Sequence, residues 1–513
     1  MLSATYSAGL CGIDGFPVTV ECNQKNGLSG FELVGLPDLA VKEAKERVRT
    51  ACYNSGYPFP HSRITVNLAP ADRKKEGSAF DIAILTAIFH SDGIIRRNVD
   101  LSGKCMVGEL SLSGEVRGVR GILCMCVAAK ENGFTEFYAP EANAVEAAAV
   151  EGITVYSVRN VRELVAHLNG EAPLTPVHTD RTAFFKASNQ YSADFIDVRG
   201  QAMAKRAMEI AAAGGHNILL IGPPGTGKSM LAKRLPSILP PLSFAEAIET
   251  TKIHSVAGVL PDGVSLLSVR PFRAPHHTMS TVSLVGGGIN PLPGEVSLAD
   301  NGVLFLDELP EFPKQVTDAL RQPLEDRRVT ITRANGRVTF PCSFMLVGAM
   351  NPCRCGYFGH PSRKCTCKPE DVKRYISRIS GPMLDRIDIQ IELPSLTYDE
   401  ISAPDAHAEH SETIRARVTV AREFARQRMN GKTNAFCNAQ LDAAGIHEFC
   451  NPDPEASALL KAAYDRMGLS ARGYDRILRV ARTIADLDSS ELIRAPHIAE
   501  AIQLRSLDRK YWG

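Results

Sequence analysis

The sequence has little of what marks aromatic-rich or strongly charged proteins. Its 513 residues include a single tryptophan, and aromatic residues make up 6%, which argues against a protein built on aromatic stacking platforms. The 58 lysines and arginines nearly balance the 57 aspartates and glutamates, so the formal net charge is only +1. This balance excludes a basic nucleic-acid coat or an acidic disordered tail at the level of the whole chain, but it allows a local basic groove.

Long apolar runs are also missing. No stretch of about 18 apolar residues predicts a membrane span, and the start Met1–Tyr6 (MLSATY) lacks the basic and apolar parts of a signal peptide. We therefore expect a cytoplasmic protein with no membrane partner. In that reducing compartment the 13 cysteines should stay unpaired, so a dense cysteine cluster would indicate metal binding.

The order of apolar patterns predicts a multidomain α/β protein. At about 150 residues per domain, the length favours roughly three domains. Residues 1–170 mix strands and helices, 171–196 read as a polar linker, 197–394 read as a parallel sheet with helices, and 395–513 are largely helical. Strands are expected at 63–68, 152–156, 218–221, 303–306 and 345–348, and helices at 81–90, 123–130 and 411–429, the last with Ser411 as its N-cap candidate.

A glycine-rich loop predicts a nucleotide site. Gly222-Pro223-Pro224-Gly225-Thr226-Gly227-Lys228-Ser229 fits G-x-x-x-x-G-K-[ST], follows an apolar run and opens a helical stretch. Glycines let backbone N–H groups close around phosphate oxygens, and the helix N-terminus adds positive potential. Lys228 is expected to reach the β- and γ-phosphates of ATP, and Ser229 to bind Mg²⁺.

Two further buried strands end in polar residues. The run 303–306 (VLFL) is followed by Asp307 and Glu308, and 344–350 is followed by Asn351. In P-loop NTPases an acidic residue at this place holds Mg²⁺, as we expect for Asp307, and Glu308 would polarise the attacking water. Asn351 could orient the water or the γ-phosphate, or it could simply close the turn after its strand.

Together these motifs resemble the AAA+ ATPases, and more narrowly the ComM/YifB family of Mg-chelatase-like proteins, over nearly the whole chain. The resemblance rests on the phosphate loop together with residues 30–38 (GFELVGLPD), 64–70 (ITVNLAP), 199–201 (RGQ), 273–278 (RAPHHT) and 302–312 (GVLFLDELPEF). It implies an AAA+ P-loop core with a parallel sheet, an α-helical C-terminal lid of Mg-chelatase type, and ATP and Mg²⁺ as cofactors.

The resemblance also implies a ring. Residues 382–388 (PMLDRID) look like the segment that carries an arginine finger, so Arg386 would reach the γ-phosphate of a neighbouring subunit; the alternative is an ion pair within the domain. Arg472, or failing that Arg476, matches the sensor-2 region, although ordinary surface arginines would look the same. A finger of this kind works between subunits, so we expect a homo-oligomer, most simply a hexamer.

Two insertions suggest how such a ring would hold a substrate. Residues 327–340 predict a β-hairpin around Asn335-Gly336, with Arg333 and Arg337 beside the tip. By resemblance this hairpin points into the pore, where its arginines would contact DNA phosphates; a solvated surface hairpin is the alternative. Residues 269–295 include Gly286-Gly287-Gly288 and are expected to form a mobile loop, in which His276-His277 have a structural rather than a metal-binding role.

Four cysteines form the dense cluster that metal binding requires. Cys353, Cys355, Cys365 and Cys367 give the spacing C-x-C-x₉-C-x-C, which satisfies a tetrahedral structural Zn²⁺. An iron–sulfur cluster and free thiols remain alternatives, and His360 could replace one of the ligands.

The N-terminal segments 76–82 and 107–127 are similar to the proteolytic domain of Lon-type proteases, an α+β fold of the ribosomal S5 domain 2 type. Those enzymes use a Ser–Lys dyad, and the matching positions here are Ala79 and Leu123, which cannot perform that chemistry. Ser78 is one residue out of register, and Lys104 lies elsewhere. Residues 1–170 are therefore interpreted as a Lon-like domain without protease activity.

Three functions are compatible with these features. The resemblance favours an ATP-driven DNA motor that performs branch migration or helicase action on single-stranded or branched DNA in recombination and natural transformation. A second interpretation is a remodelling subunit that acts on a protein partner, as in magnesium chelatase. An ATP-dependent protease is opposed by Ala79 and Leu123.

Overall fold

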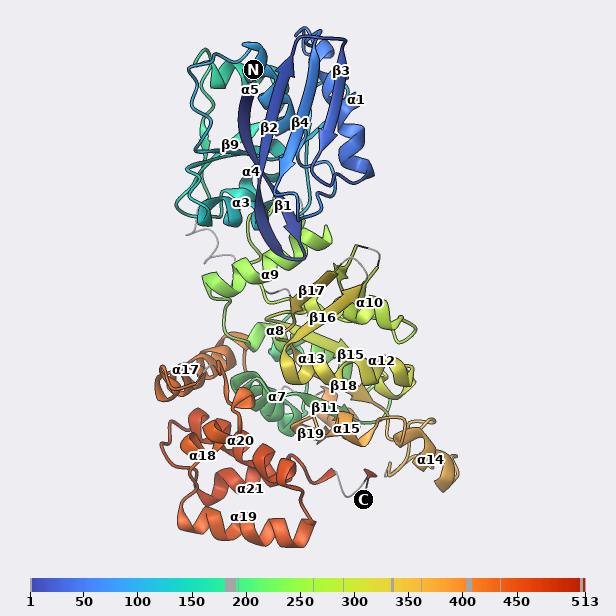
Figure 1. The fold of residues 1–513 in the computed structure, drawn as a ribbon. Helices are drawn as coiled ribbons and strands as arrows, with labels where there is room; N and C mark the ends of the chain where they lie inside the picture. Colours follow the sequence, from blue (N-terminus) through green and yellow to red (C-terminus); the bar gives the residue numbers. More distant parts are fainter. Residues whose placement is uncertain are drawn as a thin grey trace. The chain divides into compact units, whose positions relative to one another are not determined.

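A computed structural model describes residues 2–179, 191, 193–261, 263–288, 290–333, 336–360, 362–402, 408–433, 435–507 and 511–512 (Figure 1). Its residues group into two units, which are described separately. The first comprises residues 1–185, 244–267 and 332–340, and the second comprises 186–243, 268–331 and 341–513. Part of the expected linker (180–190 and 192) and the expected hairpin tip (334–335) lie outside the described residues.

The first unit is built on an eight-stranded mixed sheet. Its order is β10-β9-β8-β5-β1-β2-β4-β3, with β1, β2 and β4 antiparallel and β5, β8 and β9 parallel. The central strands alternate buried and exposed residues, the pattern of a sheet covered on one face. The strands are β1 (Leu2–Cys11), β2 (Asp14–Lys25), β3 (Gly30–Val34), β4 (Arg63–Ala69), β5 (Lys104–Met106), β8 (Glu136–Pro140), β9 (Thr154–Val158) and β10 (Pro176–Val177).

Helices cover this sheet, and one of them comes from a distant part of the chain. α2 is apolar on all sides and almost entirely buried, as expected of a helix inside a core. α9 joins the unit by packing against α3: the Glu146 carboxylate accepts hydrogen bonds from Ser255 Oγ in α9 (2.5 Å) and from Leu123 N in α3 (3.2 Å). The helices are α1 (Leu39–Asn54), α2 (Asp81–Asp92), α3 (Ile122–Glu131), α4 (Glu141–Ala147), α5 (Val161–Leu168) and α9 (Phe244–Ala257), beside a short ladder of β6 (Glu109–Leu110) and β7 (Val116–Arg117).

The second unit contains a five-stranded parallel sheet in the order β12-β15-β18-β11-β19. Its central strands are buried at every residue, as parallel strands with helices on both faces are. The strands are β11 (Ile218–Ile221), β12 (Phe272–Arg273), β15 (Val303–Leu306), β18 (Met345–Met350) and β19 (Ile389–Glu392). Because all five run the same way, the residues that follow them meet at one edge of the sheet.

The helices of this unit divide into those of the sheet domain and those of the C-terminal region, which include the two longest of the unit. The former are α7 (Ala202–Gly214), α8 (Lys228–Ile238), α10 (Thr281–Val285), α11 (Glu295–Leu298), α12 (Lys314–Ala319), α13 (Arg321–Asp326), α14 (Pro369–Ile376), α15 (Gly381–Leu384) and α16 (Tyr398–Ser402). The C-terminal region consists of α17 (Ser411–Met429), α18 (Ala443–Phe449), α19 (Pro454–Met467), α20 (Ala471–Leu487) and α21 (Ala495–Gln503). α17 and α20 pack against α7, so the helical region shares a core with the sheet domain.

The predicted fold class is confirmed: an α/β chain with a parallel sheet and a C-terminal helical region. In the part of the chain that the structure describes, no helix is long and apolar enough to cross a membrane.

One local expectation is wrong. Ser411 is not the N-cap of α17, because His410 takes that place while Ser411 Oγ donates to Asp194 Oδ1 (2.9 Å). Within the glycine run that was expected to be mobile, Gly286 and Gly287 (β13) pair with Leu292 and Pro293 (β14) in a short antiparallel ladder. A Cβ on Gly286 would come within 2.5 Å of Leu292 O, so this glycine permits a close backbone approach. The other predicted hairpin is present as β16 (Arg328–Arg333) and β17 (Gly336–Pro341).

Candidate nucleotide-binding site

The phosphate loop joins the end of β11 to the start of α8. Gly225 and Gly227 have φ angles of 82° and 90°, which other residues adopt with strain. Gly222 has a different role, because a Cβ there would lie 2.6 Å from Leu393 O. The glycines thus allow the loop to turn tightly and to present its backbone N–H groups at the helix N-terminus, where an anion is stabilised.

Lys228 lies inside this loop. Its Nζ donates to Gly222 O (2.7 Å), Pro223 O (2.9 Å) and Asn351 Oδ1 (3.1 Å), and its side chain is 8% exposed. Burial lowers the pKa of Lys228 to about 8, against the opposing influence of Asp307 and Glu308. The predicted neighbours Lys228 and Asn351 are therefore in direct contact.

The hydroxyl and carboxylate expected to bind Mg²⁺ also meet. Ser229 Oγ donates to Asp307 Oδ2 at 2.7 Å, which brings together two oxygen ligands of the kind that Mg²⁺ prefers beside nucleotide phosphates. Glu308 follows with φ 51°, an unusual conformation for a residue other than glycine. Its side chain is 56% exposed, so the carboxylate can reach a water molecule.

His277 is a site residue that the sequence did not reveal. Its Nδ1 lies 3.7 Å from Glu308 Oε2, whereas His276 Nδ1 is bonded to Thr278 Oγ1 (2.9 Å). The two rings are tilted by 33° to each other, with centroids 4.1 Å apart. The sequence predicted a structural rather than a metal-binding role for this pair; the signal that could have found His277 is its place in the motif 273–278.

Gln201 supports the loop from behind and was likewise missed as a functional residue. It has φ 54°, and its Nε2 donates to Thr226 O (3.4 Å) and Pro394 O (2.8 Å). The buried amide therefore links the phosphate loop to the segment after β19.

The predicted arginines lie at the other edge of the sheet. Arg386 and Arg472 line a cavity of about 360 Å³ together with residues that immediately precede β11, β18 and β19, namely Asn217, Phe344 and Asp388. The phosphate loop, Asp307 and Asn351 instead follow their strands. A four-residue strand spans about 13 Å, so within one chain the arginines and the phosphate loop are kept apart.

Arg386 and Arg472 have acidic partners inside the chain. Arg386 Nη2 forms an ion pair with Glu325 Oε1 and its side chain is 13% exposed, so the intradomain ion pair considered above exists, with a glutamate. Arg472 Nη1 lies 3.7 Å from Asp385 Oδ2, with a side chain that is 68% exposed. Arg476 contacts the same aspartate at 3.1 Å but is buried, so Arg472 is the better placed of the two to reach another molecule.

The hairpin presents its basic residues to solvent. Arg333 and Arg337 are exposed, and Arg333 Nη1 donates to Thr332 O (3.2 Å).

The four cysteines of the loop 353–367 converge on one point. Their sulfur atoms lie within 4.8 Å of one another, and Cys353 Sγ, Cys355 Sγ and Cys365 Sγ are 3.4–3.7 Å apart. A tetrahedral ion with metal–sulfur bonds of about 2.3 Å holds its ligands about 3.8 Å apart. His360 is engaged elsewhere, with Nε2 bonded to Ser395 Oγ (2.9 Å). The thiols fit a single ion.

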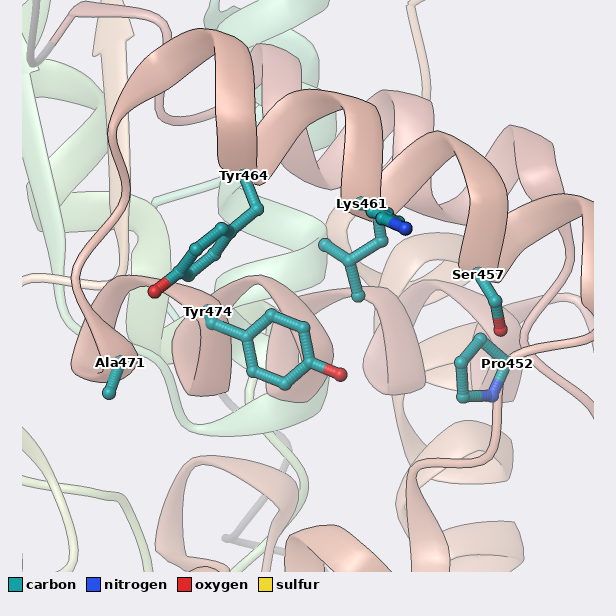
Figure 2. A pocket seen from close by; sticks show the side chains of 7 residues that line it. Pro452, Ser457, Lys461, Tyr464, Ala471 and Tyr474 are labelled. Carbon is teal, nitrogen blue, oxygen red and sulfur yellow. The ribbon is translucent and has the colours of Figure 1, made fainter.

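A second cavity, of about 410 Å³, lies on the helical region (Figure 2). Tyr464 of α19 and Tyr474 of α20 form an edge-to-face pair across it, with centroids 6.2 Å apart. Its lining contains none of the residues predicted for the nucleotide site.

In the first unit, the two positions matched to a protease dyad are apolar and buried: Ala79 is 5% and Leu123 is 0% exposed. Ser78 Oγ is hydrogen-bonded to Glu109, and Lys104 Nζ pairs with Glu136 Oε2 at 2.5 Å. These contacts hold Ser78 and Lys104 to different carboxylates.

Comparison with known proteins places these features in one family. The family described as magnesium chelatase, subunit ChlI, matches residues 194–401; a second ChlI domain matches 20–143, and the ChlI C-terminal domain matches 408–505. Competence protein ComM of Haemophilus influenzae is 42% identical over 512 residues, covering 99% of this chain and 98% of ComM. Protein YifB of Escherichia coli is 42% identical over 509 residues with the same coverage.

A more distant relative is a maternal DNA replication licensing factor, mcm6, of Xenopus tropicalis. It is 20% identical over 308 residues, which are 57% of this chain and 32% of that protein.

Proposed function

Because this chain belongs to the Mg-chelatase-like family of AAA+ ATPases, we propose that it is an ATP-hydrolysing ring motor that acts on DNA. In this proposal it drives branch migration or helicase action in homologous recombination and natural transformation. The observation that supports a motor is the arrangement of the charged groups: phosphate-binding residues lie at one edge of the parallel sheet and arginines lie at the other.

The residues around the phosphate loop have separate roles in ATP hydrolysis. The loop N–H groups and Lys228 bind the phosphates, while Ser229 and Asp307 would hold Mg²⁺, whose charge stabilises the leaving diphosphate. Glu308 accepts a hydrogen bond from the attacking water and draws its proton away. Asn351, already bonded to Lys228, orients the γ-phosphate or the water.

The arginines act between subunits. Arg386 and Arg472 cannot serve the phosphate loop of their own chain, because the length of the sheet separates them from it. In a head-to-tail ring the amino edge of one sheet faces the carboxyl edge of the next, so these arginines would reach a neighbour's γ-phosphate. Arg386 would exchange Glu325 for that phosphate. A hexamer is the assembly we propose.

DNA is the proposed substrate because of the hairpin and the relatives. Arg333 and Arg337 are exposed on β16 and β17, where they can contact phosphates without reading sequence. With a net charge of +1, DNA binding depends on such local groups. A relative named a competence protein and another named a DNA replication licensing factor support this substrate. Residues 1–170 would form a Lon-like collar without protease activity.

The test is branch migration of a labelled four-way junction with ATP. We expect the wild-type protein to convert the junction into duplex products by branch migration. An Arg333→Ala/Arg337→Ala protein should lose this activity while it hydrolyses ATP without DNA at the normal rate. Loss of two phosphate contacts should also lower the slope of log affinity against log salt by about 2. The matched control is Arg374→Ala/Arg426→Ala, which removes the same charge from exposed helix positions.

A remodelling subunit that acts on a protein partner is the second candidate. It is favoured by the fact that all three matching family domains are those of a magnesium chelatase subunit. Equal junction activity in the hairpin variant and its control, or no activity in any of the proteins, would favour this candidate over the DNA motor.

A further inference from the structure

The four-cysteine loop is attached to the nucleotide site at both of its ends. It begins two residues after Asn351, whose side chain binds Lys228. It ends at α14, from which the Tyr375 hydroxyl accepts a hydrogen bond from the Asn351 backbone N–H. One residue of the ATP site therefore anchors both the entry and the exit of the loop.

The middle of the loop touches the phosphate loop directly. Gly356 lies between Cys355 and Tyr357 with φ 85°, and a Cβ at this position would come within 2.5 Å of Pro224 Cδ and 2.9 Å of Pro224 Cγ. Pro224 is the third residue of the phosphate loop. Glycine is thus required both by the backbone conformation and by the close approach of the two loops.

The segment that follows α14 also contacts the residues after Glu308. Arg378, just after α14, donates from Nη1 to Glu311 Oε2 (2.7 Å) and to Pro310 O (3.2 Å). These residues lie two and three positions after Glu308. The cysteine loop therefore connects the phosphate loop, Asn351 and the segment after Glu308.

The local backbone is arranged for thiolates bound to a metal. The N–H groups of Tyr357 and Phe358 point to Cys353 Sγ, and those of Tyr357 and Thr366 point to Cys355 Sγ. Such hydrogen bonds orient ligands and stabilise their negative charge. In a 4Fe–4S cluster each thiolate binds a different iron, and in a 2Fe–2S cluster two pairs of thiolates bind different irons. In both, some of the sulfurs stand farther apart than in a mononuclear site, so sulfur atoms that all lie within 4.8 Å of one another favour a single tetrahedral ion.

The loop's other internal contacts are two tight turns and polar contacts among Tyr357, His360 and Arg363 near its surface. Between Cys353 and Cys367 no helix or strand is present among the described residues, and three of the four cysteines are partly exposed. A short segment without secondary structure or a core folds when a metal cross-links it. Without the ion the loop would lose its shape, and Pro224 and Asn351 would lose their support.

We propose that a tetrahedral Zn²⁺ bound by Cys353, Cys355, Cys365 and Cys367 is a structural part of the ATP site, which it holds in its binding geometry through Gly356–Pro224 and Asn351. This inference rests on the ATP site of the proposed function and is independent of DNA. Loss of one hydrogen bond to a charged group lowers affinity by about tenfold or more, so we expect metal-free protein, with a disturbed phosphate loop, to bind ATP at least about tenfold more weakly.

The test uses the full-length protein, metal analysis and the binding of a fluorescent ATP analogue without DNA. Wild-type protein should contain one zinc per chain, and a Cys365→Ser/Cys367→Ser protein should contain almost none and bind the analogue at least about tenfold more weakly. Cys11→Ser, which changes an exposed thiol outside the cluster, should behave as wild type. Normal analogue binding by the zinc-free variant would overturn the proposal, as would wild-type protein that binds the analogue while lacking metal.

Two further measurements distinguish the loss of zinc from a general folding defect of the cysteine variant. Zinc should be removable from wild-type protein with a chelator, and added zinc sulfate should restore binding of the analogue; restoration without zinc would overturn the proposal. A Gly356→Ala protein should keep its zinc yet bind the analogue more weakly, because only the contact with Pro224 is disturbed. Since every readout omits DNA, a failed DNA assay does not affect these outcomes.

Discussion

At the scale of single residues, the burial of a charged side chain determines the pH dependence of the ATP site. Lys228 carries a charge that burial opposes, so its pKa falls to about 8. Its hydrogen bonds to Gly222, Pro223 and Asn351 hold the ammonium where phosphate oxygens bind. The residue is therefore well positioned but sensitive to pH.

The lowered pKa of Lys228 predicts that ATP affinity falls in alkaline solution. Phosphate binding needs the protonated form, which is complete well below pH 8 and is lost as the pH rises through about 8. Each further pH unit should weaken binding by up to about tenfold. Titration with a fluorescent ATP analogue between pH 7 and pH 9.5 measures this.

The control for that titration is Lys228→Arg, which keeps its charge over the whole range. Its affinity is expected to be lower but independent of pH. A wild-type affinity that stays constant up to pH 9.5 would contradict the assignment.

His277 is expected to position Glu308. With Nδ1 3.7 Å from Glu308 Oε2, the ring restrains a carboxylate that is otherwise largely exposed. Replacing His277 by Ala should lower kcat about tenfold and leave KM for ATP nearly unchanged, because proton transfer depends on the orientation of the base. His276→Ala is the matched control, and equal effects of the two substitutions would count against this role.

At the scale of elements, the helical region is fixed by a buried ionic network on α20. Arg482 and Asp486 are 0% and 1% exposed and 3.0 Å apart, and Arg428 of α17 donates to Asp486 at 2.5 Å. Asn438 Nδ2 adds a hydrogen bond to the same carboxylate (2.7 Å). One aspartate therefore joins two long helices and is the counter-charge of the buried Arg482 and the half-buried Arg428.

Removing the charge of Asp486 should destabilise the folded protein. Asp486→Asn leaves Arg482 and Arg428 without their counter-charge, which typically lowers the free energy of unfolding by about 3–5 kcal/mol. Asp488→Asn is the control, since its carboxylate is 54% exposed and such pairs contribute less than about 1 kcal/mol. Urea unfolding followed by circular dichroism compares them; similar losses for both proteins would refute the argument.

The same scale shows what the sequence could and could not predict. The expected strands 218–221 and 303–306 coincide with β11 and β15, because fully buried parallel strands leave continuous apolar runs. The two-residue strands β12, β13 and β14 leave no such run. Ser411 was misassigned because its partner, Asp194, is 217 positions away, and no local pattern carries that information.

The site residues also fall into those that the sequence could predict and those that it could not. Lys228, Ser229 and Asp307 could be predicted because each lies at a fixed position after a strand, and parallel topology brings those positions together. His277 could not, because its approach to Glu308 depends on the path of the chain through residues 273–278. The predicted family is confirmed, while the roles of Arg386, Arg472 and the hairpin arginines stay predictions.

At the scale of the whole molecule, the opposite placement of phosphate loop and arginines predicts that active sites are shared. Glu308→Gln and Arg386→Ala proteins should each hydrolyse ATP poorly by themselves. When mixed, some interfaces would combine an intact Glu308 from one subunit with an intact Arg386 from its neighbour, so activity should return in part. A steady-state ATPase assay of the mixture measures this recovery.

The control for the mixture is the double variant Glu308→Gln/Arg386→Ala mixed with either single variant. With the Glu308→Gln protein no subunit carries Glu308, and with the Arg386→Ala protein no subunit carries Arg386. No interface can then combine both groups, so no recovery is expected in either mixture. If the two single variants show no recovery although they co-assemble, Arg386 does not act between subunits.

The most direct test of the central claim is ATP hydrolysis by the purified protein without DNA and with single-stranded, duplex or four-way-junction DNA. A DNA motor couples ATP hydrolysis to movement along DNA, so we predict stimulation by DNA, strongest with the junction. ATP hydrolysis that proceeds at the same rate with and without every DNA would contradict the DNA motor and favour a remodelling subunit that acts on a protein partner.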